Sequence, residues 1–199
     1  MSVSNLVIKI TDALKPVLVK IIPQEYLSRA KKAYMNRNTT KLKDAKIAPY
    51  KPGRYAEGIN LIGSIQAASG LGQSSRLVAA ELEASGMPYS IKEHHISEQL
   101  SMTEHEFDAK FSDELPYDIN LLHINAHEFT VSYMQLGKQV WDYRYNIAFW
   151  LWELEEFPAE WIDCISIVDE IWTPAEFVSN SIRTVSYTHL RAHETRSNL

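Results

Sequence analysis

The chain has 199 residues, of which 45% are hydrophobic and 23% charged, as in an ordinary globular protein. Its net charge of −5 is unevenly spread, because residues 1–50 carry 10 Lys or Arg against 3 Asp or Glu, whereas residues 51–184 carry 8 against 21. The acidic charge of residues 51–184 argues against nucleic acid as a ligand. The single cysteine excludes an internal disulfide framework and a cysteine-based zinc site. No apolar run reaches the ~18 residues that span a bilayer.

Residues 1–50 are predicted to form a basic, amphipathic helical extension and a linker. Apolar residues recur at helical spacing between positions 6 and 22, and lysines flank them. Two interpretations stay open: a helix packed on the body, or an arm formed by residues 1–35 that lies along an anionic membrane surface. Residues 36–57, which are polar and contain proline and glycine, are predicted to be the linker.

The α/β domain is placed at residues 51–184, and its first strand begins near Gly58. The apolar run that follows has the length of a buried parallel strand. The pattern changes to helical spacing at Leu71, and Gly86 is expected to end that helix as a C-cap. A strand, a glycine turn and a helix open many nucleotide-binding units, because a helix N-terminus attracts anions. The glycine spacing matches neither the dinucleotide fingerprint nor the P-loop.

Strands and helices alternate along the rest of the domain. Strands are predicted at residues 88–93, 118–125, 146–152 and 169–173, helices at 129–140, 158–167 and 174–184, and weak helix signals lie near 104–111. This alternation predicts an α/β fold with a Rossmann-like parallel sheet and helices on both faces.

Four stretches in this order resemble the N-terminal domain of group 1 (family 4) glycosyltransferases, which have the two-domain GT-B fold. They are Ser69–Gly72 with the Ser75-Arg76 helix, Tyr117–Leu121 leading to Asn125-Ala126, Trp150–Glu153 followed by Phe157-Pro158, and Val168–Pro174 followed by Phe177-Val178. The resemblance covers residues 58–184. It implies half of a retaining enzyme of polysaccharide biosynthesis that moves a sugar from a nucleotide-sugar donor to a glycan or lipid-linked acceptor. It also implies that the reaction needs no bound metal and no cofactor besides the donor.

By this resemblance, the glycine turn forms one lip of the substrate cleft. The backbone of Gly70, Leu71 and Gly72 is expected to face the donor diphosphate. The alternative is that the two glycines only close the turn between strand and helix.

Candidate substrate-binding side chains follow the third and fourth predicted strands. Asn125 and His127 are expected to line the acceptor cleft. Glu153 is expected to bind sugar hydroxyls or, as the catalytic residue, to take the acceptor's proton, because ligands of open α/β sheets bind at the carboxyl edge. The alternative for Glu153 is a solvated loop carboxylate. His123 and His127 have no third ligand at a metal-binding spacing, so no metal site is predicted.

Five other conspicuous side chains are given structural interpretations. Trp150 and Trp152 are expected to pack in the core, with sugar stacking as the alternative. His94 and His95 are expected to be polar loop residues at the end of the second strand. Cys164, which lies among apolar residues of a helix, is expected in the core.

The end of the chain departs from the family pattern. Residues 185–199 resemble translated sequencing-adaptor DNA and are expected to be non-native, with a genuine polar tail as the alternative. Nothing matches the donor-binding half and its Glu-x7-Glu motif, so the chain is expected to be truncated and inactive as a transferase by itself. The alternative function is a non-enzymatic Rossmann-like module that binds a nucleotide, a glycan or a partner. The expected location is the cytoplasm, either free or peripheral at the inner face of the plasma membrane.

Overall fold

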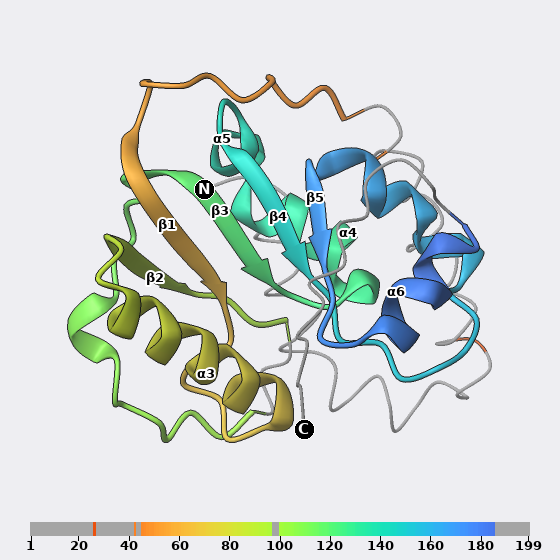
Figure 1. Cartoon of the computed structure of the whole chain (residues 1–199), viewed down its shortest axis with the longest axis horizontal. Coiled ribbons are helices and arrows are strands. Elements are labelled where there is room, and N and C mark those ends of the chain that lie inside the picture. Colours follow the sequence, from red (N-terminus) through yellow and green to blue (C-terminus); the bar gives the residue numbers. More distant parts are fainter. Residues whose placement is uncertain (1–25, 27–41, 43–44, 97–99, 186–199) are drawn as a thin grey trace.

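A computed structural model of the chain describes residues 26, 42, 45–96 and 100–185. Its centre is a five-stranded, all-parallel sheet with the strand order β2-β1-β3-β4-β5 (Figure 1). The strands are β1 (Ala56–Gly63), β2 (Tyr89–Glu93), β3 (Tyr117–His123), β4 (Tyr145–Phe149) and β5 (Glu170–Trp172). The predicted membrane arm at residues 1–35 and the predicted tail lie almost wholly outside the described residues. Within the described part of the chain, no helix is both long and apolar enough to cross a bilayer.

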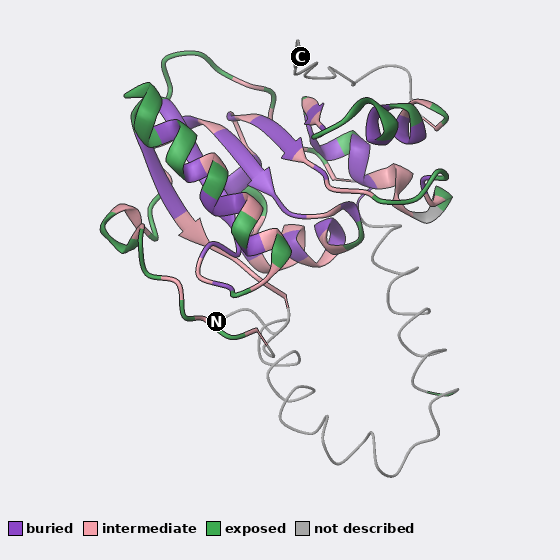
Figure 2. Cartoon of the chain, turned by 60° about the horizontal axis from the view of Figure 1, so that its bottom comes forward, coloured by how far each residue is buried: buried purple, intermediate pink, exposed green. Residues whose placement is uncertain are grey.

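Helices cover both faces of the sheet, which confirms the predicted Rossmann-like α/β fold. The helical elements are α3 (Gly70–Ser85), η1 (Asp108–Lys110), α4 (Ala126–Leu136), α5 (Lys138–Trp141), η2 (Ala159–Ile167) and α6 (Glu176–Arg183). On one face, Ala79 and Leu82 of α3 pack with apolar residues of β1 and β2. On the other face, α4, α5, η2 and α6 enclose a second core around Phe129 and Ile171. Figure 2 shows α3 with its exposed residues turned away from the sheet.

The strand order places a topological switch point between β1 and β3. From β1 the chain crosses to β2 on one side, and from β3 it proceeds to β4 and β5 on the other. Successive parallel crossovers share one hand, so the two directions put their helices on opposite faces. The loops after β1 and β3 therefore diverge and leave a crevice at the carboxyl edge, which is where ligands of doubly wound sheets bind.

A ladder of buried asparagines sets the register of the three central strands. Asn60, Asn120 and Asn146 are neighbours in the pairing of β1, β3 and β4, and all three are at most 1% exposed. Asn60 Nδ2 donates to Asn120 Oδ1 at 3.0 Å, and Asn120 Nδ2 donates to Asn146 Oδ1 at 2.9 Å. A shift of one residue would move these amides to the opposite face and leave them unpaired, so the ladder specifies one alignment.

Several elements differ from their predicted extent or type. Strand β4 ends at Phe149 rather than at residue 152, because its neighbour β5 has only three residues. The predicted helix at 129–140 begins at Ala126 and is divided at Gly137, which has a positive φ of 80°. The predicted helix at 158–167 is a 3-10 helix, η2. By contrast, α3 ends at the predicted residue, where Gly86 is left-handed with a φ of 71°.

Candidate functional site

A pocket of ≈ 220 Å³ lies at the switch point, and loops that follow β1, β2 and β3 form its wall. The residues that line it are Ser64, Ser69, Leu71, His94, His95, Ile96, Leu100, His123, Ile124 and Glu128. Polar and apolar side chains therefore line one small site together, as in binding sites for small molecules.

The loop after β1 is held by a buried arginine. Arg76, in the second turn of α3, is only 9% exposed. Its Nη1 donates to Ile65 O at 2.7 Å and to Ala67 O at 2.9 Å, and its Nη2 donates to Gln73 Oε1 at 3.1 Å. On the other side of the loop, Gln66 N–H donates to Glu93 Oε2 at 3.1 Å. The loop is thus fixed from two elements before any ligand arrives.

The start of α3 forms part of this rim. Ser69 Oγ accepts from Gly72 N–H at 3.1 Å and caps the helix. A Cβ added at Gly72 would lie 2.1 Å from Ala67 O, whereas one added at Gly70 would meet nothing within 4 Å. Gly72 therefore permits close packing of the helix on its own loop, while Gly70 is open. Leu71, between them, faces the pocket, and the N-terminal dipole of α3 gives this rim a partial positive charge.

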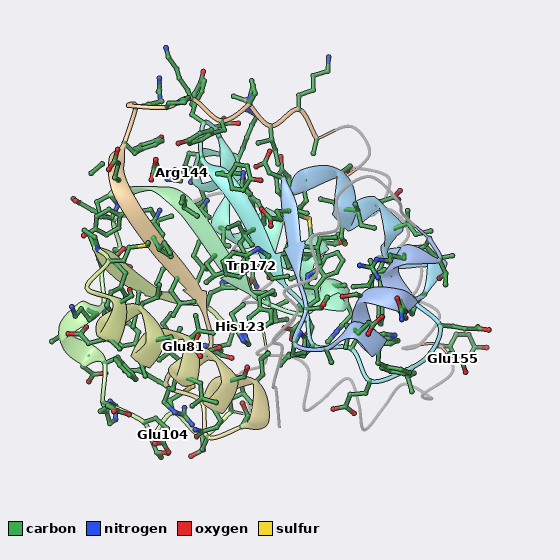
Figure 3. All side chains as sticks on the ribbon, viewed as in Figure 1. Glu81, Glu104, His123, Arg144, Glu155 and Trp172 are labelled. Carbon is green, nitrogen blue, oxygen red and sulfur yellow. The ribbon has the colours of Figure 1, made fainter. Side chains whose placement is uncertain are left out.

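His123 is the last residue of β3 and is fully buried at 0% exposure. Figure 3 shows it at the carboxyl edge of the sheet, near the end of β3. Its Nε2 lies 3.0 Å from Ser74 Oγ, and its ring meets Phe149 edge-on with the ring centres 4.8 Å apart. Its Nδ1 has no hydrogen-bond partner among the described residues. Burial lowers the pKa of His123 to about 4, so the imidazole is neutral at pH 7.

Two more histidines enter the pocket from the loop after β2. His94 Nε2 lies 2.9 Å from Ser132 Oγ, and burial lowers the pKa of His94 to about 4. His95 Nδ1 lies 3.4 Å from Glu93 Oε1. Burial raises the pKa of Glu93 above its ordinary value, against the opposing effect of its bonds from Gln66 and His95.

A carboxyl group completes the pocket from the first turn of α4. Glu128 lies beside His127, whose Nε2 is 3.9 Å from Glu128 Oε1. Burial raises the pKa of Glu128, and the nearby charges of His127 and His95 act in the opposite direction. The site thus combines imidazoles, serine hydroxyls and one carboxyl group, which can bind hydroxyls and exchange protons.

The structure brings some of the sequence-predicted site residues to this pocket and not others. Leu71 lines it, and Gly70 and Gly72 flank it. Asn125 lies in the sequence between Ile124 and Glu128, which both line the pocket. Its Oδ1 accepts from Leu151 N–H at 3.0 Å, and this bond connects the loop after β3 to the segment after β4. His127 is half-exposed, and its ring lies 5.6 Å from that of Trp161.

Glu153 is exposed and lies four residues beyond the end of β4, and it does not line the pocket. Figure 3 shows Glu155, two residues further along the same loop, far from His123. Trp150 is 1% exposed and stacks on Phe157 with ring centres 5.5 Å apart, which confirms its core position, whereas Trp152 is only half-buried. Cys164 is buried as predicted.

Sequence reasoning had given no binding role to the histidines that follow β2, to His123 or to Glu128. One signal in the sequence could have indicated them, because polar residues follow three predicted strands in succession. The carboxyl ends of parallel strands meet at one edge, so these residues could be expected to lie close together. Among the described residues, no group of three or more His, Cys, Asp and Glu side chains is arranged to hold a metal ion. No protein-family model, no curated protein and no solved structure matches the chain.

Proposed function

We propose that residues 58–184 are the acceptor-side domain of a retaining GT-B glycosyltransferase, and that the pocket binds part of its sugar substrate. In this proposal a nucleotide-sugar is the donor, and a glycan or a lipid-linked sugar is the acceptor. Gly70, Leu71 and Gly72 face the donor diphosphate, and Asn125, His127 and Glu153 serve the acceptor. The chemistry requires a donor-binding domain to act with this one.

The observation that carries the proposal is the position of the pocket. It lies at the switch point of the sheet and is lined by the loops after β1, β2 and β3, including the start of α3. Two of the four sequence stretches that resemble the glycosyltransferase family end in the loops after β1 and β3, and the other two end after β4 and β5. Hydroxyls, imidazoles and a carboxyl group are the side-chain types that hydrogen-bond to sugars.

The proposal is tested by mapping ligand contacts on the 15N-labelled 199-residue chain by NMR. UDP-glucose, GDP-mannose and a set of disaccharides are titrated separately. We expect disaccharide-induced shifts confined to the loops after β1, β2 and β3, and weaker shifts from the nucleotide-sugars at the start of α3.

Two variants on the same helix provide the control. Leu71→Asp places a carboxylate in the pocket and should abolish the nucleotide-sugar shifts. Leu77→Asp, at a position 57% exposed, should leave them unchanged. Equal binding by both variants, or shifts elsewhere on the domain, would contradict the proposal. Binding of glycans without any response to nucleotide-sugars would favour the non-enzymatic module instead.

A further inference from the structure

A line of partly exposed rings begins next to the pocket. It consists of His127, Trp161 and Trp152, which we call the aromatic platform. The ring centre of His127 lies 5.6 Å from that of Trp161, which lies 4.9 Å from that of Trp152. The His127 side chain is 50% exposed, and both tryptophans are partly exposed. The platform adjoins the pocket, because His127 Nε2 is 3.9 Å from Oε1 of the lining residue Glu128.

A buried aromatic residue supports the platform. Phe157 is 4% exposed and meets Trp152 and Trp161 edge-on, with ring centres 6.1 Å and 5.8 Å away. On its other side it stacks on the buried Trp150. The indole Nε1 of Trp152 also donates to Glu156 O at 3.1 Å. The rings are therefore oriented before a ligand arrives, which reduces the entropy that binding costs.

The charge of the surrounding segments limits the ligand. Residues 125–130 and 150–163 together contain six Asp or Glu and no Lys or Arg, so these segments repel phosphate and other anions. The exposed carboxylates of Glu153, Glu155 and Glu156 can accept hydrogen bonds from hydroxyl groups. A neutral sugar matches both features, because its ring offers C–H groups to the electron-rich face of an aromatic ring and hydroxyl groups to carboxylates.

The residues that the resemblance assigns to the acceptor lie along this platform. His127 is one of its members, and Glu153 directly follows Trp152 in the chain. Asn125 Oδ1 accepts from the N–H of Leu151, the residue before Trp152. The three residues therefore share one surface, although Asn125, His127 and Glu153 do not line the pocket itself.

The size of the pocket separates short glycans from long ones. Its volume of ≈ 220 Å³ is below the roughly 300–1,000 Å³ of sites for drug-sized molecules. A longer glycan that enters it must continue over the neighbouring surface. Figure 3 shows Glu155, in the loop between Trp152 and Trp161, at the periphery of the molecule and far from His123. The platform thus extends outward from the pocket.

We propose that the acceptor is a neutral oligosaccharide longer than a disaccharide, and that Trp152 and Trp161 stack on the sugar units that lie outside the pocket. This inference rests on the proposed function, because it takes the pocket as a sugar site. It names the class of acceptor, and it adds Trp161, to which the sequence resemblance gives no role.

The test uses the full 199-residue chain with 15N-labelled tryptophan. Maltose and maltohexaose, cellobiose and cellohexaose, and chitobiose and chitohexaose are titrated in separate experiments, together with tetralysine and inorganic phosphate. We expect at least one hexasaccharide to shift the indole resonances of Trp152 and Trp161, and its disaccharide and phosphate to leave them unchanged. The indole of Trp141, which is 0% exposed, reports whether the fold is retained.

Matched substitutions test the contribution of the rings. Trp161→Leu keeps an apolar side chain but removes the ring, and should weaken hexasaccharide binding about tenfold while disaccharide binding is unchanged. Trp172→Leu is the control, since Trp172 is also partly exposed but packs with the core on the opposite face of the sheet. His127→Ala, at an exposed position where the fold tolerates substitution, should weaken hexasaccharide binding about threefold and decides the matter if Trp161→Leu fails to fold.

The outcomes distinguish the inference from the proposed function. If saccharides of both lengths shift only the amides of the loops after β1, β2 and β3, or if Trp161→Leu binds a hexasaccharide as tightly as Trp172→Leu, the inference is wrong and the proposed function stands. If tetralysine shifts the two indoles and no hexasaccharide does, the platform binds a cationic peptide and the inference is also wrong. If no saccharide shifts any resonance of the pocket or the platform, both proposals fail.

Discussion

The guanidinium of Arg76 fixes the loop after β1 by donating to the backbone oxygens of Ile65 and Ala67. These bonds stand in for a regular backbone pairing that an irregular loop lacks. Helical spacing from Leu71 predicted the helix that carries this side chain, but a charged residue on a helix is normally solvated. Only the way the loop folds back over α3 makes the position a buried one.

Replacing Arg76 should destabilise the domain. Arg76→Met removes the side-chain donor to Ile65 O and leaves Ala67 O with only the Ser69 N–H, and we expect a loss of about 3 kcal/mol in the free energy of unfolding. Arg76→Lys should lose less, because an ammonium group can still reach one oxygen. Urea denaturation measures both, with Arg183→Met on α6 as the control. The proposed role is excluded if Arg76→Met is no less stable than this control.

The two glycines of the turn should respond oppositely to alanine. A Cβ at residue 72 would lie 2.1 Å from Ala67 O and 2.9 Å from Ser64 O. We therefore expect Gly72→Ala to cost about 1–3 kcal/mol by overpacking. Gly70→Ala has open space around the new methyl group and should be neutral or stabilising by up to about 1 kcal/mol. Thermal unfolding of the two variants provides the comparison, and equal melting temperatures would refute the distinction.

At the scale of elements, the parallel strands are joined by polar contacts as well as by apolar packing. Asn120 accepts from Asn60, donates to Asn146, and also donates to Val140 O at 2.8 Å. The ladder thus connects β1, β3 and β4 with α5, which contains Val140. Buried polar networks of this kind specify one arrangement when every member is satisfied.

Breaking the ladder at its centre should affect the whole sheet. Asn120→Leu removes three hydrogen bonds and leaves Val140 O and Asn146 Oδ1 without those donors, so we expect a loss of at least about 3 kcal/mol. Asn180→Leu on the exposed side of α6 is the control and should change stability little. Guanidinium unfolding, read by tryptophan fluorescence, measures both variants. If Asn120→Leu unfolds at the same guanidinium concentration as Asn180→Leu, the ladder does not contribute to the stability of the sheet and the prediction is wrong.

The element predictions succeeded where the deciding physics is local. The spacing of apolar residues and the cap at Gly86 gave the end of α3, because both signals lie within the helix. The end of β4 was predicted too late because the apolar run continues through Trp152, although the neighbouring strand β5 ends at Trp172, opposite Phe149. That error placed Glu153 at the sheet edge, whereas it lies in the exposed loop beyond.

At the scale of the whole molecule, the buried histidines couple stability to pH. The pKa of His94 and that of His123 are lowered to about 4, from an ordinary value of 6.5. Between these values the unfolded chain binds more protons than the folded one, so stability falls as the pH is lowered. The raised pKa values of Glu93 and Glu128 oppose this trend in part, because their folded-state carboxyls take up protons first.

We therefore expect the domain to be less stable at pH 5 than at pH 7, with a loss of up to about 2 kcal/mol for each buried histidine. Urea midpoints at the two pH values measure the difference. His94→Gln should reduce the pH dependence, whereas His105→Gln, at an exposed position, should retain it. A pH dependence that is identical in the two variants would show that His94 does not contribute.

By itself, the sequence determined the fold class, the end of α3 and the buried positions of Trp150 and Cys164, because strand and helix periods, caps and local apolar runs act over short stretches. It also marked the turn at Gly70, Leu71 and Gly72, which lies at the pocket. Only the tertiary structure decided the strand order and the site it creates. Leu71, His94 and the pair His123 and Glu128 come from three separate segments of the chain. They meet because parallel pairing brings the carboxyl ends of β1, β2 and β3 to one edge. No local pattern encodes that meeting, since it depends on which strands become neighbours.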